Sequence, residues 1–162
     1  MILKDKMILL ENVFITNTFL NITPQELIIA CLNEAGITDF VITSRMFMQK
    51  KAVSISKKNV INILQEINTI WGISEKFFFS DGVFYWGEVP SQSTIYQFDY
   101  GDNIISLERL NSFWELETVS APFVKHSHKI VVNHPDITGE FEVKKVVFVT
   151  NESGFIRTRI YF

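Results

Sequence analysis

The spacing of apolar residues changes once along the chain, and this change limits the fold more than any other sequence feature. Up to about residue 86, stretches with helical spacing of apolar residues alternate with stretches of strand-like composition. The polar, proline-containing segment 88–93 follows, and from Thr94 onward no stretch of any length has helical spacing. We therefore expect an α+β lobe at 1–90 and an all-β lobe at 91–162, or one continuous domain that contains both.

Two helices are predicted in the first lobe. Residues 23–26 (Thr-Pro-Gln-Glu) form a helix start, because the threonine hydroxyl and the glutamate carboxylate can each accept the other residue's backbone N–H. An apolar stripe follows and Gly36 ends this helix. A second amphipathic stretch predicts a helix from about Ser56 to Trp71, with Gly72 as its cap.

Strands are expected between and after these helices. Strand-like composition occurs at 39–43 and 47–55, and again at 76–80 and 83–86. Asp81-Gly82 joins the last two as a tight hairpin, because both residues tolerate positive φ. The predicted order is strand–helix–strand–strand–helix–hairpin, a small sheet with two helices packed on one face.

The second lobe reads as a series of strands, which predicts an antiparallel β-barrel or a sandwich-like lobe. The expected strands are 94–100, 104–110, 113–119, 123–133, 141–150 and 155–162. Within 141–150 the alternation of apolar residues shifts by one position across Lys144-Lys145, which indicates a β-bulge.

Composition excludes several classes of protein. The chain has 162 residues, and its 15 phenylalanines exclude a disordered protein. Its net charge of −3 gives no indication of the basic face that nucleic-acid binding needs. A single cysteine, Cys31, lies on the first apolar stripe and is interpreted as a packed core thiol. The first eleven residues lack the apolar run of a signal peptide, and the longest purely apolar stretch, Leu27 to Leu32, is too short to cross a membrane.

Few residues form a pattern that could carry chemistry. His126 and His128 would point to the same face of a strand, a spacing that can bind zinc or iron, although edge-strand histidine pairs are common without a metal. Glu115 and Glu117 fit a solvated strand face better than a pair of glycosidase carboxylates. We find no nucleophile elbow and no phosphate-binding loop. The sequence therefore predicts no catalytic residue, no cofactor and no enzyme.

The surplus of aromatic residues in the predicted hairpin favours protein–protein assembly instead. Aromatic residues occupy both faces of its two strands, and a small lobe buries only one such face by itself. Two arginines share one face of the last strand, where a salt-bridged surface is the simpler interpretation than an anion site. The assembly-interface candidates are Phe78, Phe84, Tyr85, Trp86, Arg157 and Arg159.

Three segments resemble the bacteriophage tail hub family that includes late-control protein D and the type VI secretion spike. They are the helix within 23–37, the helix and hairpin within 59–87, and Lys129 to Val143, which is similar to the end of the hub barrel. The resemblance implies a structural protein of a tail or baseplate hub that acts without catalysis, in the virion or in the host cytoplasm during assembly. Its implied partners are spike, tube or tape-measure proteins and further copies in a homotrimer, with neither nucleic acid nor membrane.

Two alternatives remain open at this point. A metal-binding protein would use His126 and His128 together with a carboxylate. A small-ligand-binding protein would use an aromatic pocket that includes Tyr85, Trp86 and Trp114.

Overall fold

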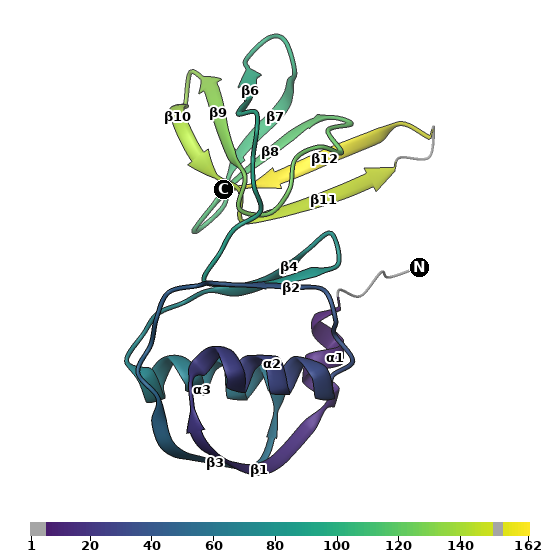
Figure 1. Cartoon of the computed structure of the whole chain (residues 1–162). Coiled ribbons are helices and arrows are strands. Elements are labelled where there is room, and N and C mark those ends of the chain that lie inside the picture. Colours follow the sequence, from purple (N-terminus) through teal and green to yellow (C-terminus); the bar gives the residue numbers. More distant parts are fainter. Residues whose placement is uncertain (1–5, 151–153) are drawn as a thin grey trace. The chain divides into compact units, whose positions relative to one another are not determined.

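The computed structural model describes residues 6–150 and 154–162, which divide into two compact units with the boundary between Val89 and Pro90 (Figure 1). The first unit contains α1 (Met7–Asn12), β1 (Phe14–Ile22), α2 (Pro24–Glu34), β2 (Phe40–Ile42), β3 (Lys50–Asn59), α3 (Val60–Trp71), β4 (Phe77–Ser80) and β5 (Val83–Trp86). The second contains β6 (Tyr96–Asp99), β7 (Ile104–Arg109), β8 (Trp114–Val119), β9 (Lys129–His134), β10 (Ile137–Glu142), β11 (Lys145–Thr150) and β12 (Ile156–Tyr161). The predicted α+β class is confirmed.

The strands of the first unit form two sheets, where the sequence led us to expect one. β1 and β3 pair with each other, and β2, β5 and β4 form a separate sheet in that order. Figure 1 shows α2 and α3 running between the two sheets. Both helices bury their apolar stripes in one core with residues of both sheets, among them Leu32, Ile63 and Phe84, which are fully buried. Two sheets form because the helices have wide apolar stripes, and such helices bury more apolar surface between two sheets than against a single sheet.

Helix α2 begins as the sequence predicts. The Thr23 side chain accepts from the N–H of Glu26, and the Glu26 carboxylate accepts the N–H of Thr23 at 2.8 Å. Gly36 follows the helix with φ +69°.

Helix α3, in contrast, begins four residues later than predicted. Residues up to Asn59 continue β3, because Asn59 and Lys58 pair with Phe14 and Ile15 of β1. Asn59 then caps the helix by accepting from the N–H of Asn62. Strand pairing, which has no local sequence signal, decides this boundary.

The β4–β5 hairpin is confirmed together with its turn. Asp81 and Gly82 have φ +50° and +80°, so both central residues take the left-handed conformation that this turn requires.

The second unit consists of a three-stranded sheet, β10-β9-β6, and a four-stranded sheet, β11-β12-β8-β7, and its sandwich-like arrangement agrees with the expected class. One pair, β6 with β9, is parallel, which the sequence did not indicate. Ile130, Val132, Leu116 and Ile160 from the two sheets are fully buried in a single core.

Two predicted features of this unit were wrong. Of the expected strand 123–133, only the part from Lys129 onward is a strand, and the residues before it form turns. The phase change at Lys144 is not a bulge, because 137–142 and 145–150 are separate strands in different sheets. Buried Val143 still pairs with His128, and Lys144 already donates its N–H to the Tyr161 carbonyl at 2.7 Å, so the chain crosses between the sheets here.

No helix in the described parts of the chain combines the length and the apolar character needed to span a membrane.

Replacing Thr23 with alanine tests the capping box. Thr23→Ala removes the hydroxyl that accepts the Glu26 N–H and donates to the Glu26 carboxylate, so the free energy of unfolding of the first unit should fall by about 1 kcal/mol. Urea denaturation followed by helical circular dichroism measures this. Thr69→Ala, at an exposed position in α3, is the matched control and should leave the free energy unchanged or slightly higher.

The thiol of Cys31 provides a second test, because burial raises its pKa from the ordinary value of 9.0 to about 12, with a smaller effect of the Glu34 charge. A disulfide reagent at about pH 8 should therefore react only after unfolding, since the thiolate is the nucleophile. An unfolded thiol ionises at a lower pH than the folded one. Stability should thus fall as pH rises above about 9, and Cys31→Ala should lack this component. Rapid reaction of the folded chain would contradict the buried position.

Candidate functional site

The β4–β5 hairpin sends alternate aromatic side chains to opposite faces of its sheet. Phe84 and Trp86 are fully buried in the core of the first unit, so their prediction as assembly-interface residues does not fit the structure. Their side chains point inward because Phe79, which pairs with Phe84, and Phe47, whose ring lies 5.7 Å from that of Trp86, close the core around them. The sequence pattern alone could not show which face the core would take.

The opposite face of the hairpin retains the other two aromatic candidates. Phe78 and Tyr85 are cross-strand partners, and their rings stack at 5.5 Å with an angle of 12° between planes. Val41 of β2 pairs with Tyr85 and continues the same face. Phe78 and Tyr85 are half-buried and Val41 is exposed, so this face combines apolar character with partial access to solvent.

A second apolar feature of the first unit is the methionine segment, residues 43–48 between β2 and β3. Met46 and Met48 are 96% and 85% exposed, more than any other large apolar residue among those described. Between them, Phe47 points back into the core against Trp86. This pair was not among the predicted sites because 47–55 was expected to be a strand, although the Met-Phe-Met alternation was a usable signal.

Side chains of α2 and α3 donate hydrogen bonds to the backbone of this segment. The Gln25 amide donates to the carbonyls of Thr43 and Arg45 at 3.3 and 2.6 Å, and the Trp71 indole N–H donates to the Met48 carbonyl at 2.7 Å. The Arg45 guanidinium lies 5.3 Å from the Phe47 ring centroid. The segment therefore keeps a defined course without belonging to a strand.

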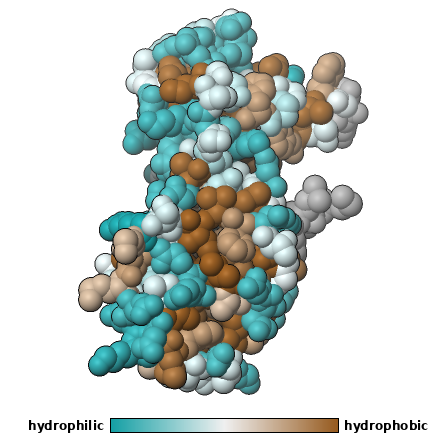
Figure 2. Space-filling model, in the orientation of Figure 1, coloured by the Kyte–Doolittle hydropathy of each residue, from teal (hydrophilic) through white to brown (hydrophobic). Residues whose placement is uncertain are grey.

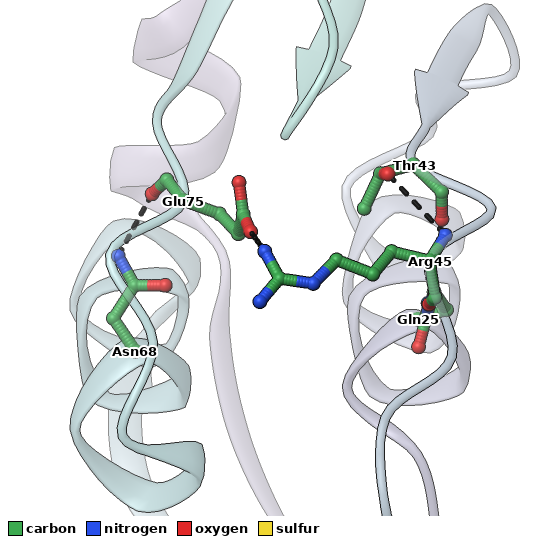
Figure 3. A network of polar contacts seen from close by, with 5 residues as sticks. All are labelled: Gln25, Thr43, Arg45, Asn68 and Glu75. Carbon is green, nitrogen blue, oxygen red and sulfur yellow. Dashed lines mark hydrogen bonds and ion pairs between the residues drawn. The ribbon is translucent and has the colours of Figure 1, made fainter.

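Figure 3 shows how Arg45 connects this segment to the end of α3. Its guanidinium donates to the Glu75 carboxylate at 2.9 Å, and the Asn68 amide donates to the Glu75 carbonyl at 2.8 Å. The Glu75 side chain is 19% exposed and that of Arg45 67%, so solvent screens the pair and its stabilisation is small. Its effect is to orient Arg45 and, with it, the methionine segment.

Figure 2 shows apolar residues gathered on one face of the first unit, in the region of the β2–β5–β4 sheet and the helices. A patch of this kind is typical of surfaces that bind other proteins.

In the second unit, Arg157 and Arg159 lie on the outer face of β12, as the alternation predicted. Arg159 donates to Glu117 at 3.0 Å and lies 3.5 Å from Glu115, and the hydrogen bond to Glu117 raises the pKa of the guanidinium. Arg157 lies 5.9 Å from the ring centroid of Phe155. This is the salt-bridged face that the sequence favoured. Its role as an assembly interface stays a prediction.

His126 and His128 do not share a strand face. They belong to a turn in which Ser127 has φ +65°, and this turn is held by hydrogen bonds between Ser127 and Val143 and between Val143 and His128. His128 is buried and its Nδ1 accepts the N–H of Lys125, while His126 Nδ1 lies 2.7 Å from the Ser127 hydroxyl. Within residues 6–150 and 154–162, no group of three or more metal-ligating side chains comes together.

Solved structures of three other proteins are similar to this chain. The 43 kDa tail protein of prophage MuSo2 from Shewanella oneidensis matches with a TM-score of 0.78 and 11% identity, over 98% of this chain and 69% of that one. The tail protein from Neisseria meningitidis MC58 matches with a TM-score of 0.72 and 9% identity, over 94% and 70%. The likeness is one of fold.

The third is an Escherichia coli component of the type VI secretion system, described as structurally similar to T4 bacteriophage tail proteins. It matches with a TM-score of 0.69 and 12% identity over 96% of this chain, which spans about half (52%) of that protein. No protein-family model matches the sequence, and no curated protein matches it either. The expected resemblance to phage tail and type VI secretion proteins is thus confirmed at the level of the fold.

Removing the Gln25 amide tests whether the methionine segment is held by side chains. Gln25→Ala leaves two carbonyls without their donor, so the first unit should lose about 1 kcal/mol of stability and the amides of 44–49 should exchange faster with deuterium. Hydrogen exchange with mass spectrometry measures the second effect. Gln65→Ala, on the exposed side of α3, is the control, and equal exchange in both variants would argue against this role of Gln25.

Proposed function

We propose that this chain is a structural component of a phage or prophage tail, at the baseplate hub, and that it acts by assembly with other proteins and without catalysis. The observation that carries the proposal is the likeness of fold to a prophage tail protein over 98% of the chain. A match that includes both units supports a shared structural role better than a match to one small domain would, because single domains recur in unrelated functions.

The surfaces of the first unit support the same proposal. The methionine segment, residues 43–48, presents two flexible, polarisable side chains on a backbone that is already ordered. Methionine side chains adapt to irregular partner surfaces, and an ordered backbone reduces the entropy lost on binding. The face of Phe78, Tyr85 and Val41 adds a second apolar area that is partly accessible to solvent.

The partners proposed are spike, tube or tape-measure proteins and further copies of this chain in a homotrimer. The alternative of a metal-binding protein has no observation in its favour, since the two histidines lie on a turn and are engaged with neighbouring groups. The alternative of a small-ligand-binding protein has no observation in its favour either, because Trp86, one of the aromatic residues proposed for it, is fully buried in the core of the first unit.

Light scattering on the purified chain over a range of concentrations tests self-assembly. We expect a trimer, and Met46→Ser combined with Met48→Ser should raise its dissociation constant about tenfold, as removal of apolar anchors does at other interfaces. The control is Leu20→Ser on β1, where the side chain is also exposed.

The same samples can be oxidised with hydrogen peroxide and analysed by mass spectrometry. Met46 and Met48 should be oxidised quickly in the monomer and protected in the trimer, because oxidation follows exposure. A chain that stays monomeric at about 100 µM would contradict the homotrimer, and a trimer with both methionines unprotected would contradict this interface.

A further inference from the structure

The turn between β7 and β8 separates two cavities of the second unit. One has a volume of about 350 Å³ and is lined by Leu110, Phe113, Lys144, Lys145 and Tyr161. The other, of about 120 Å³, is lined by residues 109–114. Leu110 and Phe113 line both cavities and are 39% and 49% exposed, so they form an apolar ridge that borders both; the two cavities and this ridge are called the groove below.

The ridge is part of an ordered turn. The N–H of Leu110 donates to the Phe113 carbonyl at 2.8 Å, and Trp114 exchanges hydrogen bonds with Phe162 at 2.9 and 3.1 Å. A partner that binds here meets a preformed surface and does not have to order a loop.

Two of the three charged side chains that line the cavities are cations that lie over aromatic rings. Lys145 Nζ is 5.3 Å from the ring centroid of Tyr161, and the Arg109 guanidinium is 5.8 Å from that of Trp114. Burial and the carboxylate of Glu115 raise the pKa of Tyr161, so its ring carries no charge near neutral pH. Cations held over rings keep most of their positive charge available to an anion, since the ring offers no full negative charge.

Two carboxylates lie near the groove, and both already have partners. Glu115 lies 3.5 Å from Arg159 and also acts on Tyr161, and Glu142 lies 2.8 Å from Lys144. Both partners of the second pair are more than 40% exposed, so a ligand carboxylate can replace Glu142 at little cost. Among the described residues that line the two cavities, none is Asp or Glu, although the chain as a whole has a net charge of −3.

We propose that this groove binds an acidic–apolar segment of another tail protein. One aromatic or large aliphatic side chain occupies the larger cavity against Leu110, Phe113 and the Tyr161 ring. Carboxylates on either side of it contact the cations at the two ends of the groove, Lys145 with Lys144 and Arg109.

The size and chemistry of the groove select this occupant. A volume of about 350 Å³ is at the lower end of the range for ligand pockets, which suits a single large side chain better than a cofactor. The apolar lining favours a large apolar side chain in the cavity, and the excess of positive charge favours carboxylates on either side of it. The assignment of the partner to a tail depends on the function proposed above, whereas the chemistry of the groove does not.

Amide NMR titration of the ¹⁵N-labelled full chain tests the proposal. The probe is the peptide acetyl-Glu-Asp-Phe-Asp-Glu-amide, with two matched peptides in which glutamine and asparagine replace the acids or serine replaces the phenylalanine. We expect shifts at residues 109–114, 144–145 and 161 with the acidic phenylalanine peptide, and affinities at least about fivefold lower for both matched peptides.

Variants of the chain separate the two parts of the site. Lys144→Gln with Lys145→Gln should weaken binding about tenfold and reduce its salt dependence, and Phe113→Ser should weaken it at all salt concentrations. Lys129→Gln is the control, because Lys129 is an exposed lysine of the same unit that pairs with Glu140.

Three outcomes would overturn the proposal: no shift in the groove at about 5 mM peptide, where even weak contacts register, equal binding of the neutral peptide, or shifts centred elsewhere. Binding of vesicles that contain phosphatidylserine, lost in the lysine variants while the peptide does not bind, would assign the groove to a membrane surface instead. None of these results depends on trimer formation, so failure here is distinguishable from failure of the proposed assembly.

Discussion

The first unit depends on the burial of apolar side chains between its two sheets. Each large side chain that α2, α3 and the β4–β5 hairpin place in this core contributes about 1.5–3 kcal/mol, whereas an exposed ion pair such as Arg45 with Glu75 contributes about 0–1 kcal/mol. Burial in the core therefore determines where the helices and strands lie. The polar contacts orient the side chains and segments that remain outside the core. Phe47 illustrates this division, because its ring packs inside while the residues on either side of it project into solvent.

This contrast between core and polar contacts explains how the chain presents apolar groups without a long loop. In the methionine segment, the Thr43 N–H donates to the Trp86 carbonyl of β5 at 3.0 Å, and the carbonyls at 43, 45 and 48 accept hydrogen bonds from the Gln25 and Trp71 side chains. The ridge at 110–113 of the second unit follows the same principle, with a closed turn behind exposed Leu110 and Phe113. In both cases the backbone is ordered before binding, so the binding free energy is not spent on ordering the chain.

The fold could be predicted from the sequence wherever the signal was local. The capping box at Thr23, the positive-φ turn at 81–82 and the alternation along β12 all depend on residues close together in the chain, and the structure confirms each of them. The start of α3 and the crossing at Lys144 could not be predicted, because they depend on pairing with strands distant in sequence, β1 and β12. The candidate site was predicted only in part: Phe78 and Tyr85 face outward, whereas Phe84 and Trp86 lie in the core and the methionine pair was missed.

The sequence by itself determined the α+β class, the capping box of α2, the glycines that follow both helices, the hairpin and a resemblance to tail proteins. Spacing, turn residues and apolar periodicity act over a few residues. Only the tertiary structure decided which aromatic residues are buried, that the strands divide among four sheets and that His126 and His128 lie on a turn. The reason is that the face of a strand which becomes the core depends on what packs against it. That choice is made by contacts between segments far apart in the chain.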